Sequence, residues 1–219
     1  MNTLWEKYNT PFWILIGIFI YLFILTIIYL VLKFAFGKKL GGIGIYLSYF
    51  IMFPLLLLGE ITAYPRRRKM WLIRSGLKEG QSYLEEGIGL GTSLILASKI
   101  VGAKGRVYAL DNHPLQIIML SLRSKIRRIK NIKLILSDAS ETGLTDNIID
   151  TIFICDAFHE FQDKRNTATE LYRILKPGGS LNVLEEESTK YANNAKKIIE
   201  STNLFKLAER DKKFIRFEK

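Results

Sequence analysis

Cysteine and histidine are scarce in this chain of 219 residues, which has one cysteine and two histidines. A single cysteine cannot form an internal disulfide, and Cys155 lies in an apolar stretch, as is typical of a core residue. His113 and His159 have no clustered partners of the metal-ligating types, so the sequence indicates no metal site. Internal repeats and low-complexity segments are also lacking, which favours one ordinary domain with an additional segment.

Charged residues are missing from two long stretches near the amino terminus, residues 12–32 and residues 40–59. About 20 consecutive apolar residues are enough to span the hydrocarbon core of a bilayer. We therefore expect residues 1–60 to be a membrane anchor with helices at about 12–36 and 40–59. The chain start carries Glu6 next to Lys7 rather than the basic start of a secretory signal, and no small-residue cleavage site follows, so we expect the anchor to be retained.

The second apolar run is less regular than the first, because Gly41, Gly42, Gly44 and Pro54 interrupt it. It is compatible with a full span or with a segment that enters the bilayer and returns, and we favour two spans. Basic residues 66–69 follow it directly, and such clusters mark the cytoplasmic side. The sequence therefore predicts a membrane protein with a cytoplasmic globular part. Trp71, just beyond the cluster, is expected in an interfacial aromatic belt.

The net charge of +11 is unevenly divided. Residues 1–59 hold four lysines and one glutamate, which leaves a charge of +8 for residues 60–219. A basic domain beside a bilayer is attracted to anionic lipid headgroups, although an ordinary solvated surface explains the charge as well. The basic residues between Lys125 and Lys130 lack interleaved aromatic residues, so nucleic acid is not the expected partner. The sequence does not indicate an oligomeric state.

The remaining chain alternates between strand and helix patterns, as a parallel sheet requires. Residues 61–80 are expected to form a basic linker with a short helix at 70–75, and residues 81–219 the main domain. Strands are predicted at 82–86, 106–111, 132–137, 149–155, 180–185, 205–209 and 214–217. Helices are predicted at about 92–101, 114–129, 164–175 and 190–202. Residues 176–179, Lys-Pro-Gly-Gly, indicate a break before the fifth strand.

A glycine-rich turn joins the first predicted strand to the following helix. Gly87, Gly89 and Gly91 follow Glu85 at alternating positions. Missing side chains let a ligand approach the backbone, and the helix amino terminus favours negative charge. A nicotinamide-type fingerprint requires a small residue where Thr92 stands, so this pattern indicates a different cofactor.

Glu85 and the Gly-x-Gly-x-Gly turn at the end of the first strand resemble the first motif of the class I S-adenosylmethionine-dependent methyltransferases, which consists of an acid, a hydrophobe and Gly-x-Gly-x-Gly. The resemblance extends over about residues 70–219 and includes Asp111 after the second strand, residues 137–139, residues 156–160 and Leu-Lys-Pro-Gly-Gly at 175–179. It is closest to the branch that methylates quinones and other small molecules. It implies an α/β, Rossmann-like, seven-stranded and mostly parallel sheet, with S-adenosylmethionine as cofactor.

The resemblance also implies the cofactor-binding residues. Glu85 would bind the ammonium group of the cofactor, Asp111 the ribose hydroxyls and Asp138 the adenine amino group. Glu86 departs from the family, which has an apolar residue there, so it either points away from the core or replaces Glu85 in the ammonium contact. The predicted cofactor-binding residues are Glu85, Glu86, Gly87, Gly89, Gly91, Asp111, Asn112, Asp138, Ala139 and Asp156.

His159 and Asp156 are the candidate catalytic residues, because they follow the fourth strand at the edge where open parallel sheets bind ligands. A histidine there can accept a proton from the acceptor, or can simply shape the pocket. The sequence thus predicts a membrane-anchored methyltransferase for a lipid or a lipophilic small molecule. The alternatives are an anchored protein or RNA methyltransferase and a non-catalytic protein that binds S-adenosylmethionine.

Overall fold

The computed structural model describes residues 17, 19–21, 23–28, 64–89, 91–186 and 188–219. The chain divides into two compact units, Met1–Ile61 and Thr62–Lys219.

In the first unit, residues 17, 19–21 and 23–28 are helical, and large apolar side chains such as Phe19 and Phe23 are 71% and 60% exposed. Within the described ranges, no helix is both long and apolar enough to cross a membrane. The remainder of the predicted 12–36 helix and all of the predicted 40–59 helix lie outside the described residues.

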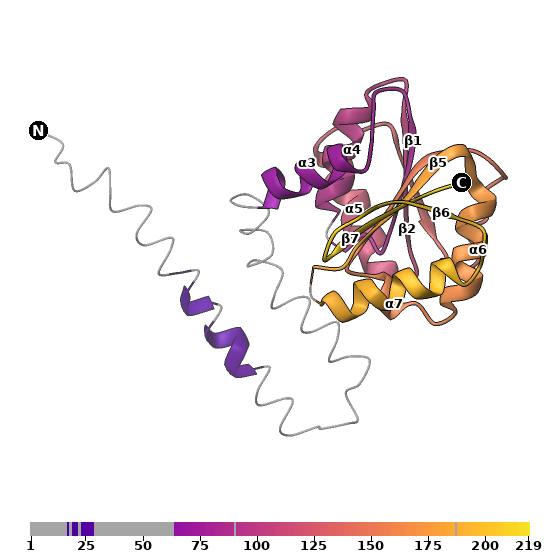
Figure 1. Cartoon of the computed structure of the whole chain (residues 1–219). Helices are drawn as coiled ribbons and strands as arrows, with labels where there is room; N and C mark the ends of the chain where they lie inside the picture. The colour runs from indigo at the N-terminus through magenta and orange to yellow at the C-terminus, as the bar shows by residue number, and fades with distance from the viewer. Residues whose placement is uncertain (1–16, 18, 22, 29–63, 90, 187) are drawn as a thin grey trace, which may run out of the picture. The chain divides into compact units, whose positions relative to one another are not determined.

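The second unit is built on one seven-stranded sheet with the order β3-β2-β1-β4-β5-β7-β6 (Figure 1). Strands β1 to β5 are parallel to their neighbours, whereas β7 runs antiparallel to both β5 and β6. The strands are β1 (Ser82–Glu86), β2 (Arg106–Asp111), β3 (Ile132–Leu136), β4 (Ile149–Cys155), β5 (Leu175–Leu184), β6 (Lys206–Arg210) and β7 (Phe214–Glu218). The predicted α/β class and the mostly parallel seven-stranded sheet are confirmed.

Helices cover both faces of this sheet. They are α3 (Tyr64–Arg74), α4 (Thr92–Val101), α5 (Pro114–Ile126), the 3-10 helix η2 (Phe158–Glu160), α6 (Lys164–Ile174) and α7 (Thr189–Glu200). Apolar residues of α3, α4 and α5 pack with Tyr83 in one core cluster, and those of α6 and α7 pack with Leu84 in the other. Adjacent residues of β1 therefore face opposite layers, as the alternation of side chains along a strand requires.

Three local predictions differ from the structure. The helix expected at 70–75 begins at Tyr64. The break expected at residues 176–179 is part of β5, because Leu175 already pairs with Ile149 and a register shift absorbs the irregular backbone. Trp71 is not available for an interfacial belt, since it is 9% exposed and stacks on Phe214 with ring centroids 5.4 Å apart. A buried indole stabilises the core of the globular unit instead.

The carboxyl ends of the parallel strands β1 to β4 lie at one edge of the sheet. β1 ends before Gly87, β2 ends at Asp111, β3 is followed by Ser137 and Asp138, and β4 is followed by Asp156. Open α/β sheets bind ligands in the crevice outside these carboxyl ends. The fold therefore places the predicted site residues along one edge.

Candidate active site

The glycine turn after β1 is packed too closely for larger residues. Gly87 has φ +70°, and a Cβ built on it would lie 2.3 Å from the Cβ of Ala157. A Cβ on Gly91 would lie 2.6 Å from Cδ1 of Leu120. Gly89 has φ +49°, but no heavy atom of the described residues lies within 4 Å of the Cβ position. The turn thus packs against the protein at its two ends and is open at its centre, where a ligand can approach.

Asp111 holds the glycine turn in place. Its Oδ2 accepts the backbone N–H of Ile88 at 3.0 Å, and its Oδ1 accepts that of His113 at 2.8 Å. Burial raises the pKa of this carboxyl, and the two hydrogen bonds act in the opposite direction. Because each carboxylate oxygen can accept more than one hydrogen bond, Asp111 retains capacity for two hydroxyls of a ligand.

Asp138 and Ala139 form the loop after β3. Oδ1 of Asp138 accepts the backbone N–H of Ser140 at 2.9 Å and its hydroxyl at 2.7 Å, and these bonds lower the pKa of the Asp138 carboxyl. Asp138 is therefore ionised at neutral pH and available as an acceptor. The neighbouring Ala139 is buried, with 6% of its surface exposed.

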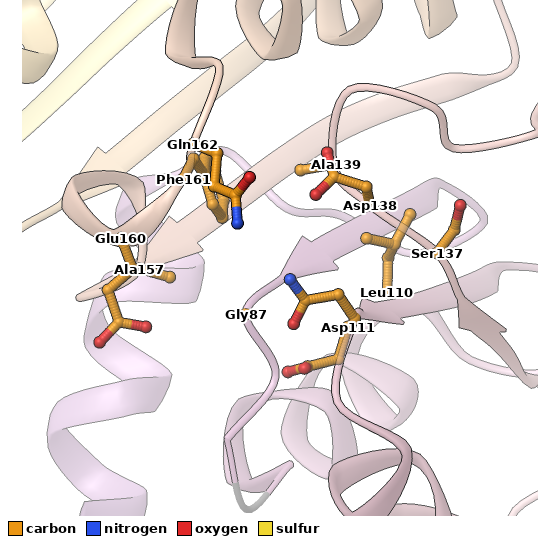
Figure 2. A pocket seen from close by; sticks show the side chains of 11 residues that line it. Gly87, Leu110, Asp111, Ser137, Asp138, Ala139, Ala157, Glu160, Phe161 and Gln162 are labelled. Atoms are coloured by element: carbon orange, nitrogen blue, oxygen red, sulfur yellow. The ribbon is translucent and has the colours of Figure 1, made fainter. Parts of the chain in front are cut away.

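A pocket opens between these segments (Figure 2). It is lined by Gly87, Leu110, Asp111, Asn112, Ser137, Asp138, Ala139, Ala157, Glu160, Phe161 and Gln162. The ends of β2 and β3 form one side of it, the segment after β4 forms the other, and Gly87 lies between them.

Five predicted cofactor residues meet at this pocket: Gly87, Asp111, Asn112, Asp138 and Ala139. The lining does not include Glu85, Glu86, Gly89, Gly91, Asp156 or His159. Sequence reasoning missed Leu110, Ser137, Ala157, Phe161 and Gln162, whose only signal was their position next to strand ends. These five residues line the pocket because the backbone brings them there, and not because their residue types are typical of a binding site.

Glu85 is buried on the α3–α4 side of the sheet. It is 3% exposed and accepts the hydroxyl of Tyr83 at 2.8 Å. Burial raises the pKa of Glu85 to about 7, against the opposing effects of the Tyr83 hydrogen bond and the Arg68 guanidinium. Arg68 of α3 also donates to the sulfur of Cys155. Burial raises the pKa of the Cys155 thiol, so this cysteine is a neutral core residue, as the sequence predicted.

Glu86 lies on the opposite face of β1. Its register neighbours are Leu110 and Ile154, and its side chain is fully buried. Among the described residues, neither carboxylate oxygen has a hydrogen-bond partner. Burial raises the pKa of Glu86 well above its usual value, and the charges of Glu170 and Asp138 add to this effect. The suggestion that Glu86 points away from the core is therefore wrong, because its strand position directs it inward.

His159 forms a defined pair with Glu185, which extends from the end of β5. Nδ1 of His159 lies 2.8 Å from Oε2 of Glu185, and the backbone N–H of His159 donates to Oε1 at 3.2 Å. The imidazole also stacks on Tyr191, with ring centroids 4.3 Å apart and an interplanar angle of 7°. The Glu185 side chain is fully buried, and that of His159 is 18% exposed. These contacts fix the ring orientation next to the pocket segment that contains Glu160.

Asp156 has a structural position in this region. Its φ is +50°, and its Oδ1 accepts the backbone N–H of Glu186, which links the end of β4 to the end of β5. Asp156 therefore stabilises the contact between the segments that follow β4 and β5. A direct catalytic role for Asp156 stays a prediction.

Known proteins are similar to this chain in sequence and in fold. A family model described as a methyltransferase domain matches residues 84–183. The curated relatives include the ubiquinone/menaquinone biosynthesis C-methyltransferase UbiE of Psychromonas ingrahamii, which is 35% identical over 121 residues, 53% of this chain and 47% of the relative. The UbiE protein of Vibrio cholerae is 36% identical over 115 residues, 51% of this chain and 43% of the relative. The chain spans about half the length of the curated relatives it matches.

Solved structures show the same architecture. A SAM-dependent methyltransferase from Aquifex aeolicus aligns with a TM-score of 0.60 and 27% identity, over 68% of this chain and 87% of that one. A SAM-dependent O-methyltransferase from Thermotoga maritima shares the fold with a TM-score of 0.58 and 18% identity, over 72% and 66% of the two chains. The fold, the glycine turn and these similarities support a class I S-adenosylmethionine-dependent methyltransferase domain. S-adenosylmethionine is the cofactor of this class, as the sequence predicted.

Proposed function

We propose that the protein is a membrane-anchored methyltransferase that transfers a methyl group from S-adenosylmethionine to a lipophilic small molecule. A ring carbon of a quinone precursor is the first acceptor to test. The main support is the pocket between Gly87, Asp111 and Asp138, within the region that is similar to the UbiE C-methyltransferases. The His159–Glu185 pair adds a proton acceptor beside that pocket.

The pocket residues fit the proposed cofactor. The centre of the glycine turn is open at Gly89, where the amino-acid portion would lie. Asp111 would accept the ribose hydroxyls, and Asp138 with the amide of Ala139 would contact the adenine edge. When bound, the cofactor supplies a methyl group already activated on a sulfonium. The chain's main contribution is then to hold the acceptor in line with that methyl group and to exclude water.

His159 is proposed to accept the proton that the acceptor loses. The Glu185 carboxylate accepts the backbone N–H of His159, and it can accept the Nδ1–H as well. This second bond assigns the proton of the neutral ring to Nδ1 and leaves Nε2 as the basic nitrogen. A neighbouring carboxylate also stabilises the imidazolium formed after proton transfer. The stack on Tyr191 restricts ring rotation, so the basic nitrogen keeps one direction.

Membrane attachment is proposed from the amino-terminal unit. Its described helical residues include seven large hydrophobic side chains that are 43% to 71% exposed: Phe19, Ile20, Tyr21, Phe23, Ile24, Ile27 and Ile28. Uncharged apolar surface of this kind is favourable in lipid and costly in water. The basic residues 66–69 favour a cytoplasmic position for the methyltransferase domain. A lipid-soluble acceptor would then reach the enzyme without leaving the bilayer.

Incubation of the purified full-length protein with methyl-labelled S-adenosylmethionine and a bacterial membrane extract tests the function. We expect label in an organic-soluble quinone fraction, as a base-stable carbon-bound methyl group, and strongly reduced labelling by the Asp111→Asn variant at low cofactor concentration. Label in RNA or protein instead would favour the second candidate, for which the charge of residues 60–219 is the supporting observation. Cofactor binding without release of S-adenosylhomocysteine across all fractions would indicate a non-catalytic protein.

A further inference from the structure

Helix α5 has three large aliphatic side chains exposed to solvent. Ile118, Leu122 and Ile126 are 61%, 55% and 72% exposed. The positions buried against the sheet are instead Gln116, Leu120 and Ser124. A helix that only covers a sheet carries its apolar residues inward and its polar residues outward. Helix α5 departs from that pattern, because two of its three buried positions are polar and its outermost positions are aliphatic.

The three exposed residues form a continuous stripe. They are spaced four residues apart, and residues with this spacing lie one above the other on the same side of a helix. Single exposed apolar residues are common on soluble proteins, but a contiguous row marks a contact surface. We call Ile118, Leu122 and Ile126 the α5 stripe.

Positive charge is concentrated at the carboxyl-terminal end of α5 and just beyond it. Residues 114–130 contain five basic residues, Arg123, Lys125, Arg127, Arg128 and Lys130, and no acidic residue. A hollow at the carboxyl end of α5 is lined by Lys99, Lys104, Arg106, Arg128 and Lys130, and none of the described residues that line it is acidic. We call this feature the basic hollow. Its charge is suited to phosphate groups, and the neighbouring stripe is suited to hydrocarbon.

We infer that the α5 stripe and the basic hollow together dock the methyltransferase domain on an anionic bilayer surface. Amphipathic helices of this type place aliphatic residues at the boundary of the acyl chains and basic residues among the headgroups. Each lysine or arginine near an anionic surface strengthens such binding roughly fivefold. An RNA partner would leave the aliphatic stripe exposed, and the stripe offers no aromatic ring for base stacking.

Docking through α5 would also orient the cofactor pocket. Helix α5 begins at Pro114, three residues after Asp111, so its first turn lies at the pocket edge of the sheet. The basic hollow lies at the other end of α5, beside the start of β2 at Arg106, so a bilayer that contacts both features would lie along the length of the helix. The inference concerns a second membrane contact, separate from the amino-terminal apolar runs. It does not depend on the identity of the acceptor, because contact with lipid is measured without turnover.

The test is site-directed quenching in the full-length protein, reconstituted in nanodiscs that contain a nitroxide-labelled lipid. A fluorophore is attached at Leu122→Cys, and the matched control carries it at Leu207→Cys on β6, at the opposite edge of the sheet. The native Cys155 is buried, so wild-type protein treated in the same way gives a low background. We expect quenching at position 122 in discs containing phosphatidylglycerol, little in purely zwitterionic discs, and little at position 207 in either.

The charge contribution is tested with Arg127→Gln and Lys130→Gln combined. We expect the docking equilibrium in anionic discs to weaken by roughly 25-fold, as two lost cations imply. Unchanged S-adenosylmethionine affinity verifies that each labelled protein is folded. Ile126→Cys serves as a second labelling position.

Equal quenching at positions 122 and 207, or quenching independent of anionic lipid, would overturn the inference. Loss of quenching at position 122 as the protein concentration rises would assign the surface to a second copy of the chain. Loss of quenching on addition of RNA would assign it to nucleic acid.

Discussion

Nδ1 of His159 lies 2.8 Å from Oε2 of Glu185, and the backbone N–H of the same histidine donates to the other carboxylate oxygen. The two residues are 26 positions apart in the chain and meet because β4 and β5 are parallel neighbours. Their side chains thus come from adjacent strand ends at the ligand-binding edge of the sheet. The paired contacts hold the imidazole in one orientation at that edge.

His159→Gln is expected to lower kcat by roughly a hundredfold or more, because general-base catalysis contributes about 10²- to 10⁴-fold. The cofactor affinity measured by calorimetry should not change, since His159 does not line the pocket. Glu185→Gln should lower kcat less, because the backbone and the Tyr191 stack still hold the imidazole after the carboxylate is lost. Wild-type kcat in His159→Gln would rule out the base assignment.

Gly87→Ala is expected to destabilise the domain in a way that depends on Ala157. The new Cβ would meet Cβ of Ala157 at 2.3 Å, in a backbone conformation with φ +70°. Adding Ala157→Gly should restore part of the lost stability, with a coupling free energy of about 1 kcal/mol or more in a thermal-unfolding double-mutant cycle. Gly89→Ala, which meets open space, is the control and should show no coupling with Ala157→Gly. Additive effects of Gly87→Ala and Ala157→Gly would contradict the packing argument.

Much of the fold could be predicted from the sequence, because strand and helix patterns alternate and Gly87, Asp111 and Asp138 mark three successive strand ends. Residues without a distinctive type, such as Phe161 and Gln162, could not be assigned to the pocket. Their position depends on how the segment after β4 turns. The α5 stripe was also missed, since an apolar helix face carries no sign in the sequence of whether it packs inward or faces solvent. Trp71 was misassigned because interfacial and buried indoles have the same local sequence context.

Cofactor affinity is expected to increase with pH between about 6 and 7.5. The pKa of Glu85 is raised to about 7, so its ionised fraction rises several-fold across this range. If the carboxylate binds the cofactor ammonium, the Kd measured by calorimetry should fall up to roughly eightfold. The amino group of the cofactor has a pKa of about 8, so it stays mostly protonated over this pH range. Glu85→Gln should abolish the pH dependence, and Glu79→Gln, an exposed acid on β1's amino-terminal side, should not. A Kd that does not change with pH in the wild-type protein would refute the ammonium contact.

Glu86→Gln should flatten the pH dependence of stability. The folded-state pKa of Glu86 lies well above 4.5, so unfolding releases a proton between the two pKa values. The free energy of unfolding therefore falls as pH rises above about 4.5, by up to about 1.36 kcal/mol per pH unit from this group. Urea unfolding at pH 5 and pH 8, followed by far-UV circular dichroism, measures the slope.

Glu86→Val should raise the free energy of unfolding at pH 8 by about 1–3 kcal/mol, because it removes a buried polar group that has no partner among the described residues. At pH 5 the gain should be smaller, since the acid is then neutral in the folded state and costs less to bury. An equal gain at both pH values, or a loss at pH 8, would show that Glu86 is satisfied in the folded protein.

The central claim is that S-adenosylmethionine binds in the pocket formed by the glycine turn and Asp111, and calorimetric titration tests it most directly. The comparison is between the wild type, Asp111→Asn and the control Asp150→Asn. The Asp150 carboxylate accepts the backbone N–H of Ser82 near the amino-terminal ends of the parallel strands, away from the pocket. We predict one site in the wild type, a roughly 10- to 100-fold loss of affinity in Asp111→Asn from the missing charge-assisted hydrogen bonds, and no loss in Asp150→Asn. Unchanged affinity in Asp111→Asn, or no binding to the wild-type protein, would contradict the account.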